Sequence, residues 1–248
     1  MFNLLVVLLV AFAGSLLTFF CGFGLGTILL PVFLIFFDAP IAIAMTAIVH
    51  FLNNLFKLLL TKKHIDLSIL KSFGIPSVLG AVVGSLLLTS FNLQDVGAQS
   101  ALKRLIGLLL IVFAFIEWWT SFRKWQIDSR WYFAGGLVSG FFGGLSGHQG
   151  ALRSAFLSKF NLDKNTWIAT GVAIACCVDL TRLTVYSKQI STASTYIHYQ
   201  SLGVALMGAI AGAILGNTLL KKMNIQILHI SVTIGLIIFG ILLIFGVI

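Results

Sequence analysis

The chain has 248 residues, of which 59% are hydrophobic and only 9% are charged, and its formal net charge is +9. So few charges exclude a soluble globular fold and are typical of a protein embedded in a bilayer. On a soluble protein the positive charge would suggest nucleic acid, but here it indicates Lys and Arg in cytoplasmic loops, so we expect a lipid bilayer and no nucleic acid as partner. Since no change of composition marks a second domain, residues 1–248 are predicted to form a single transmembrane transporter domain.

Apolar segments follow one another along the whole chain. A full crossing takes about 20 residues of helix. Two segments are too short for this, because eleven or twelve residues rise only about 17 Å in a core of ~30 Å. We therefore expect an all-α, polytopic helical bundle with about eight to ten membrane segments, two of them half-helices. The segments lie at residues 3–20, 26–37 (short), 40–60, 69–89, 99–119, 130–145, 150–160 (short), 165–186, 196–219 and 225–247.

Each short segment begins at a glycine-rich break. Residues 21–27 read Cys-Gly-Phe-Gly-Leu-Gly-Thr, and residues 143–150 read Gly-Gly-Leu-Ser-Gly-His-Gln-Gly. Breaks at corresponding positions of two halves of a membrane chain indicate a substrate site. The first segment has no basic leader or obvious cleavage site, so it is interpreted as a retained helix rather than a signal peptide.

Several short matches predict that the two halves are repeats, about 1–120 and about 130–248. If the basic loops lie inside, both termini lie outside and five passes per half make the repeats inverted. The Gly-x-x-x-Gly faces are predicted to pack helices closely within the bundle, with a homodimer as the less favoured use. The matches are Gly80-Ala81-x-x-Gly84 with Gly208-Ala209-x-x-Gly212, Ile106-Gly107-Leu108 with Ile234-Gly235-Leu236, Gly26 with Gly150, and Thr46 with Thr170.

The start of a half-helix favours an anion, because its backbone N–H groups are unpaired and it carries a partial positive charge. Glycines let an anion approach that backbone closely, and two such ends would converge near the midplane. The alternative is that the glycines only permit helices to cross. The candidate anion-binding residues from the two breaks are Gly24, Gly26, Thr27, Gly147 and Gly150.

The second break also carries polar side chains that the first lacks. His148 and Gln149 are costly at membrane depth unless they meet a cavity or a partner, so at least one is expected to face the ligand. The alternative is a helix-end cap or a hydrogen bond to a neighbouring helix. Arg153 follows one turn after Gly150 and could hold an oxyanion with its planar guanidinium, or could extend towards the membrane surface.

The helices that follow the two breaks carry further polar residues. Asn53, Asn54 and Lys57 lie in 40–60, whereas Asp179 and Arg182 lie in 165–186. A shift of 125 aligns Asn54 with Asp179 and Lys57 with Arg182. Charges inside a span usually face the bundle interior and mark a pathway. The alternatives are a structural Asp179–Arg182 pair and a Lys57 side chain that extends to the surface.

The predicted membrane-embedded charges include more cations than carboxylates, which favours an anionic substrate. In this set Asp179 is the carboxylate, with a possible coupling or ion-pair role. His50, on the face of Lys57, is interpreted as a buried hydrogen-bonding group rather than a proton carrier. Without Cys-x-x-Cys spacing we expect no metal, and no cofactor.

An intramembrane enzyme is disfavoured. An aspartyl protease needs two facing carboxylates, and Asp179 is the only deep one. A serine enzyme would need Ser146 or Ser154 beside His148, but these lie on one short segment, whereas a base usually comes from another helix.

At these residues the chain resembles the sulfite exporter TauE/SafE family, also called the 4-toluene sulfonate uptake permeases. The resemblance lies in Gly22-Phe-Gly-x-Gly26-x-x-x-x-Pro31, Gly136-x-x-Ser139-Gly140-x-x-Gly143-Gly144 and Ala169-Thr170. It implies transport of sulfite, organosulfonates or related anions across the bacterial inner membrane by a multi-pass protein. The chain departs from the family at Ser146–Gly150 and at Phe156, where a proline is expected.

The resulting hypothesis is a secondary transporter that moves a small sulfur-containing oxyanion by alternating access. The alternatives are an anion channel and a transporter for another small organic anion.

Overall fold

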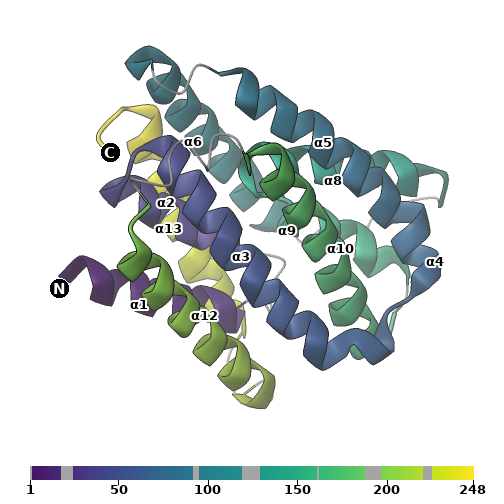
Figure 1. Ribbon diagram of the computed structural model, residues 1–248. Helices are drawn as coiled ribbons and strands as arrows, with labels where there is room; N and C mark the ends of the chain where they lie inside the picture. Colours follow the sequence, from purple (N-terminus) through teal and green to yellow (C-terminus); the bar gives the residue numbers. More distant parts are fainter. Residues whose placement is uncertain are drawn as a thin grey trace.

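The computed structural model describes residues 2–17, 25–91, 95–118, 129–160, 162–187, 197–219 and 225–248, and every regular element in these ranges is helical (Figure 1). This confirms the predicted all-α class. The α-helices are α1 (Phe2–Leu17), α2 (Leu25–Phe36), α3 (Ala39–Thr61), α4 (Leu67–Ile69), α5 (Ile75–Ser90), α6 (Val96–Trp118), α8 (Tyr132–Ser146), α9 (Gly150–Leu157), α10 (Lys164–Val185), α12 (Tyr199–Leu219) and α13 (Ile225–Ile244). Single turns also occur, as η1 (Lys62–His64), η2 (Leu70–Gly74), η3 (Ser129–Trp131) and η4 (Ser158–Phe160).

Five helical stretches within the described residues are long and apolar enough to cross a membrane. One of them, Leu67–Ser90, joins α4 to α5 through η2. There the helix widens into a π-helical turn just before Pro76, which has no N–H to continue the regular hydrogen bonding. The chain is thus a polytopic membrane protein. The long stretches are Ala39–His64, Leu67–Ser90, Val96–Ile116, Lys164–Val185 and Tyr199–Gly216.

The two helices after the breaks are short, as predicted. Helix α2 has 12 residues and α9 has 8, which corresponds to rises of about 18 and 12 Å. The helix before the second break, α8, has 15 residues, so it is also shorter than the 20 residues of a full crossing.

The helices pack in pairs that join the two halves of the sequence. Helix α5 lies along α8, α1 lies along α12, α6 crosses α13, and α3 packs on α10 (Figure 1). These pairings are unchanged when α1 is exchanged with α8, α3 with α10, α5 with α12 and α6 with α13. Each of these eight helices therefore packs on a helix from the other half, whereas α2 and α9 pack mainly on helices of their own half. The predicted repeat boundaries and the inversion stay predictions.

The Gly-x-x-x-Gly faces make close helix contacts within the bundle, as predicted. Gly80 of α5 lies against the Leu137 carbonyl of α8, and Gly84 lies against that of Phe141. A β-carbon at either glycine would collide with this backbone. Gly208 and Gly212 of α12 meet the carbonyls of Leu8 and Phe12 on α1 in the same way.

The crossing of α6 and α13 also depends on glycine. A β-carbon on Gly107 would lie 2.6 Å from the Gly240 carbonyl oxygen, and one on Gly240 would lie 2.7 Å from the Gly107 carbonyl oxygen. The two backbones therefore touch at a point where neither helix has a side chain.

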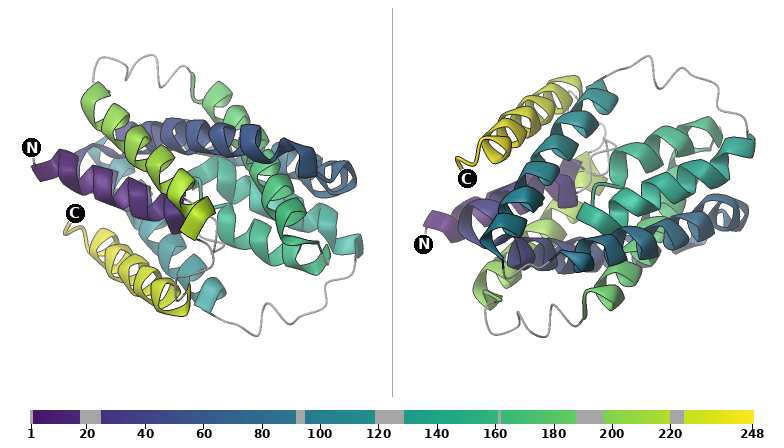
Figure 2. Two further views of the ribbon diagram at one scale, coloured as in Figure 1. Left: turned by 90° about the horizontal axis from the view of Figure 1, so that it is seen from below. Right: turned by 90° about the horizontal axis from the view of Figure 1, so that it is seen from above.

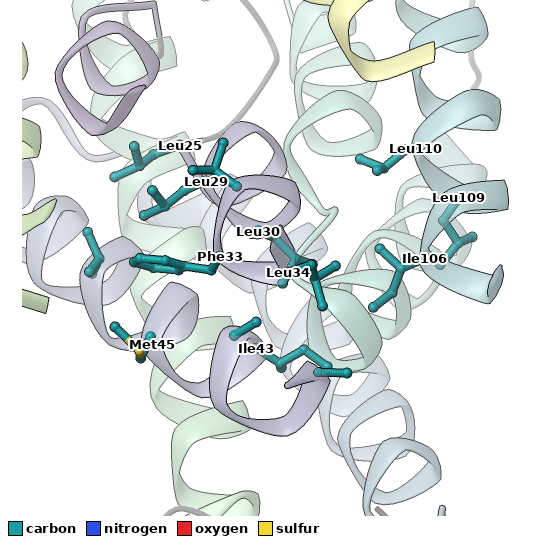
Figure 3. Close-up of a cluster of buried hydrophobic side chains, with 14 of the residues drawn as sticks. Leu25, Leu29, Leu30, Phe33, Leu34, Ile43, Met45, Ile106, Leu109 and Leu110 are labelled. Carbon is teal, nitrogen blue, oxygen red and sulfur yellow. The ribbon is translucent and has the colours of Figure 1, made fainter. Parts of the chain in front are cut away.

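The larger apolar core surrounds α2. Leu25, Leu29, Leu30 and Phe33 are fully buried, and Figure 3 shows them among side chains of α3 and α6. A helix that is apolar on all sides belongs in a protein core or in lipid, and here other helices cover most of α2. The core thus fixes α2, and with it the backbone at the end of the first break.

The two ends of the chain lie close together in all three views (Figures 1 and 2). The end of α3 and the basic turn Lys62–His64 lie at the far side of the molecule from them (Figure 1). That the termini and the Lys62-Lys63 loop are on opposite sides of the membrane stays a prediction.

Candidate functional site

The second break starts where α8 ends at a left-handed residue. Gly147 has φ +83°, and its N–H donates to the Gly143 carbonyl at 2.9 Å. Glycine tolerates this conformation, which commonly ends a helix. The chain then turns through His148 and Gln149 into α9, and every residue from Gly143 to Gly150 is buried. The break is therefore held in the interior.

The end of α8 is anchored by side chains from two other helices. The Gly144 carbonyl accepts hydrogen bonds from the Tyr186 hydroxyl, just beyond α10, and from Ser85 Oγ of α5 at 3.4 Å. Both donors are buried, although they do not belong to the predicted site. They satisfy a carbonyl that the end of the helix leaves without a partner.

The two breaks meet, as the sequence predicts. A β-carbon on Gly26, in the first turn of α2, would lie 3.7 Å from the Gly147 carbonyl oxygen and 3.5 Å from the His50 ring. Thr27 beside it is also buried. Gly24, the remaining candidate from the first break, lies outside the described residues.

Asp179 is the centre of a buried network between α3 and α10. Its Oδ2 lies 2.6 Å from His50 Nδ1 and accepts a bond from Asn54 Nδ2 at 3.3 Å. Its Oδ1 accepts a bond from Arg182 Nε at 3.0 Å. The direct contact between Asn54 and Asp179 joins two positions that the repeat alignment made equivalent. His50 is a buried hydrogen-bonding group, as expected.

Lys57 and Asn53 form a second network, towards α1 and α12. The Asn53 amide nitrogen lies 3.2 Å from the Ala209 carbonyl, and its oxygen lies 3.2 Å from Lys57 Nζ. Lys57 also donates to the Ser15 carbonyl at 3.4 Å. Lys57 is only 2% exposed, so its side chain does not extend to the surface. Asn53 is held by these partners, away from Asp179.

His148 and Gln149 are each only 1% exposed, although both are polar. Nδ1 of His148 lies 2.9 Å from Ser146 Oγ, and its ring faces that of Phe113 with a centroid separation of 5.9 Å. The Gln149 side chain does not cap α9, and neither its Oε1 nor its Nε2 has a partner in the described part of the chain. Nε2 of His148 is likewise without a partner there.

The two arginines of the site also have buried nitrogens without hydrogen bonds among the described residues, namely Nη1 of Arg153 and both Nη atoms of Arg182. Arg182 Nη2 lies 3.0 Å from Asp179 Oδ1 but is not aligned for a hydrogen bond. Its guanidinium lies against Gly147, where a β-carbon would be 2.6 Å from Nη1. Arg153 lies near Gly171 of α10 and interacts electrostatically with Asp179 and Lys57.

We call this group the central polar cluster: His50, Asn54, Lys57, Gly147, His148, Gln149, Arg153, Asp179 and Arg182. It contains three cationic side chains and one carboxylate, with buried N–H donors that no described group accepts. A buried polar group without a partner is costly, so the arrangement suits a ligand that supplies negative charge and acceptor oxygens. No group of His, Cys, Asp or Glu among the described residues is placed to hold a metal ion.

Sequence reasoning missed several residues that shape this site. Ser15, Phe113, Ser146 and Tyr186 each contact it through the fold. Ser146 alone was considered, as a nucleophile, whereas it is a hydrogen-bond partner of His148. The sequence gives little evidence for their role in the site, because an isolated serine or aromatic residue in an apolar helix looks like any packing residue.

Comparison with known proteins identifies one family. The model of the family described as Sulfite exporter TauE/SafE matches residues 6–243, which is nearly the whole chain. Neither a curated protein nor a solved structure matches the chain.

Proposed function

Because the chain belongs to the sulfite exporter TauE/SafE family, we propose that it carries a small sulfur-containing oxyanion of the sulfite or organosulfonate class. It does so across the inner membrane, as a secondary transporter that alternates access to the central polar cluster. Membership confirms the resemblance seen in its motifs and makes the chain a multi-pass membrane transport protein. No catalytic role is assigned to any residue.

One observation supports this proposal above the others. Arg182, Arg153 and Gln149 have buried N–H groups without hydrogen bonds among the described residues, and the cluster has more cations than carboxylates. Arg182 and Gln149 lie at the second break. A tetrahedral or pyramidal oxyanion accepts several such bonds at once and offsets the excess positive charge. A cation would face the same groups with repulsion.

Alternating access is consistent with how the helices pack. The cluster takes residues from both halves, since α3 belongs to the first and α9 and α10 belong to the second. A relative rotation of the halves would therefore open the site to one side and close it to the other. Glycine backbone at Gly26 and Gly147 would contact the anion, and the arginines would neutralise it.

The first test is a thermal-shift panel on the purified protein with sulfite, sulfate, thiosulfate and methanesulfonate. At least one of them should raise the unfolding temperature, because a ligand that binds only the folded state stabilises it. If none of these anions stabilises the protein while cations do, the proposal is wrong.

The second test is flux of the stabilising anion into vesicles that contain Arg182→Gln. Because Asp179 keeps His50 and Asn54 as partners, the variant should fold but lose uptake almost completely. Arg130→Gln makes the same change at an exposed position and should transport normally. Unchanged flux in Arg182→Gln would contradict the assigned site. Saturation and counterflow distinguish a carrier from an anion channel.

A further inference from the structure

The hydrogen bond from Ser146 to Phe142 favours one ring nitrogen of His148, Nδ1, as the one that carries the proton. Ser146 Oγ donates its single proton to the Phe142 carbonyl at 3.2 Å. The same oxygen lies 2.9 Å from His148 Nδ1. When Ser146 donates to Phe142, its oxygen accepts from His148, and Nδ1 is then the donor. In the neutral ring, Nε2 then carries a lone pair and no proton, and it has no hydrogen-bond partner among the described residues.

The surroundings of His148 favour this neutral form when no anion is present. Arg182 on α10 is the charged group that acts on it, and it is positive. Helix α8 contributes Ser146 and α6 contributes the ring of Phe113, neither of which is charged. The one carboxylate of the cluster, Asp179, is already held by His50, Asn54 and Arg182. Buried imidazolium next to a guanidinium, without an anion, would be strongly disfavoured.

An oxyanion in the cluster changes this balance. Its oxygens are acceptors, and a lone pair on Nε2 would repel them, whereas a proton between Nε2 and an oxygen makes a charge-assisted hydrogen bond. The added negative charge also offsets the repulsion from Arg182. Binding of the anion therefore favours protonation at this one nitrogen.

We propose that the site takes up one proton with each anion, and that the proton lies between His148 Nε2 and an oxygen of the bound anion. The proton comes from the solvent and forms the N–H bond with the Nε2 lone pair, while Nδ1 keeps its bond to Ser146. His148 is thus a specificity-determining residue that links anion binding to proton binding. This inference rests on the proposed function, because it requires an anion in the central polar cluster.

The test measures the number of protons bound per anion. Titration calorimetry of the purified full chain in buffers with different ionisation enthalpies gives this number near neutral pH. Sulfate, thiosulfate and methanesulfonate serve as probes because their charge does not change in this range, and data for sulfite are corrected for its own ionisation. We expect about one proton per anion, with affinity falling about tenfold for each unit of rising pH.

Two variants locate the proton. His148→Gln replaces Nε2 by an amide that donates without titrating, so the anion should bind with no proton uptake. Ser146→Ala removes the acceptor that holds the proton on Nδ1, so a neutral ring can donate from Nε2, and uptake should fall below that of the wild type. His64→Gln changes an exposed histidine in η1 and should keep the wild-type proton count.

The outcomes separate this inference from the proposed function. Anion binding without proton uptake in the wild type overturns the inference and leaves the function intact. Uptake that persists in His148→Gln also overturns it and assigns the proton to the His50–Asp179 pair. If no anion binds the wild type at all, both proposals are wrong. If His148→Gln does not fold, Ser146→Ala still locates the proton, and uptake equal to the wild type in that variant overturns the inference.

Discussion

Gly147 serves two purposes at one position. Its positive φ of 83° ends α8, and its missing side chain leaves room for the Arg182 guanidinium. The loop can thus present its carbonyl to Gly26 on one side and its α-carbon to Arg182 on the other. The conformation and the contact both require glycine, so a substitution should affect stability and binding together.

Gly147→Ala should lower both the stability and the anion affinity of the protein. Placing a non-glycine residue in the left-handed region costs about 1–3 kcal/mol. The new β-carbon would also lie 2.6 Å from Arg182 Nη1 and displace it. Thermal unfolding and anion binding of the purified variant measure the two effects.

Gly203→Ala provides the control for this change. Gly203 lies within α12, and a β-carbon there meets nothing within 4 Å. Alanine at this position should leave the unfolding temperature unchanged or raise it slightly, because glycine weakens a helix. Equal behaviour of the two variants would mean that the backbone at Gly147 is not constrained as described.

At this scale the sequence was most informative where polarity conflicts with membrane depth. His148, Gln149, Asp179 and Arg182 stand out because each is expensive in an apolar segment, and all four lie in the cluster. Which partner each one meets depends on helix pairing, which no local pattern encodes. Asn53 and Asn54 are neighbours in sequence, yet they belong to separate networks.

At the scale of elements, α10 begins at a capping residue that can be tested by pH. The Asp163 carboxylate accepts bonds from the backbone N–H groups of Asn165 and Thr166 and from the Thr166 hydroxyl. The Thr166 hydroxyl, followed by the backbone bonds, lowers the pKa of Asp163 below its ordinary value. This residue lies outside the membrane span Lys164–Val185.

Asp163→Ala should lower the unfolding temperature by an amount that depends on pH. Since the folded pKa is depressed, the stabilisation is complete above the ordinary pKa of an aspartate and disappears as the pH falls through the lowered folded value. The difference in unfolding temperature between variant and wild type should therefore be larger at neutral pH than in acid. A difference independent of pH would contradict the capping role.

The close packing of α5 on α8 predicts a large loss of stability when a single methyl group is added to Gly140. A β-carbon on Gly140 would overlap the backbone of Ser77, with its carbonyl carbon 2.5 Å away. Because backbone cannot move aside as a flexible side chain can, Gly140→Ala should destabilise the protein by about 1–3 kcal/mol or more. Thermal unfolding beside Gly235→Ala, whose β-carbon meets nothing within 4 Å, measures this effect. A variant as stable as the wild type would refute such close packing.

The sequence indicated that these glycine faces pack, but not which helices they pack against. A Gly-x-x-x-Gly face shows that a backbone comes close, whereas the partner follows from the path of the whole chain. The short helices were easier to predict, because both the break and the length are local properties.

At the scale of the whole molecule, the positions of the ends lead to a topology test. Tags at both termini should react with a membrane-impermeant reagent added to intact cells, because the ends lie together and are expected outside (Figure 2). Cysteines placed at exposed Lys62 or Lys63 should react only after the membrane is permeabilised. Termini that react on opposite sides would contradict the arrangement.

The contact between Gly107 and Gly240 has a mechanical consequence. Helices α6 and α13 are the last in each half, and at their crossing backbone lies against backbone, with the side chains of Ile111, Leu243 and Ile244 packed beside it. Such a contact keeps the two helix axes close together at one fixed point. If the halves rock during transport, this crossing can act as the pivot, and the axis of rotation then lies at two residues outside the central polar cluster.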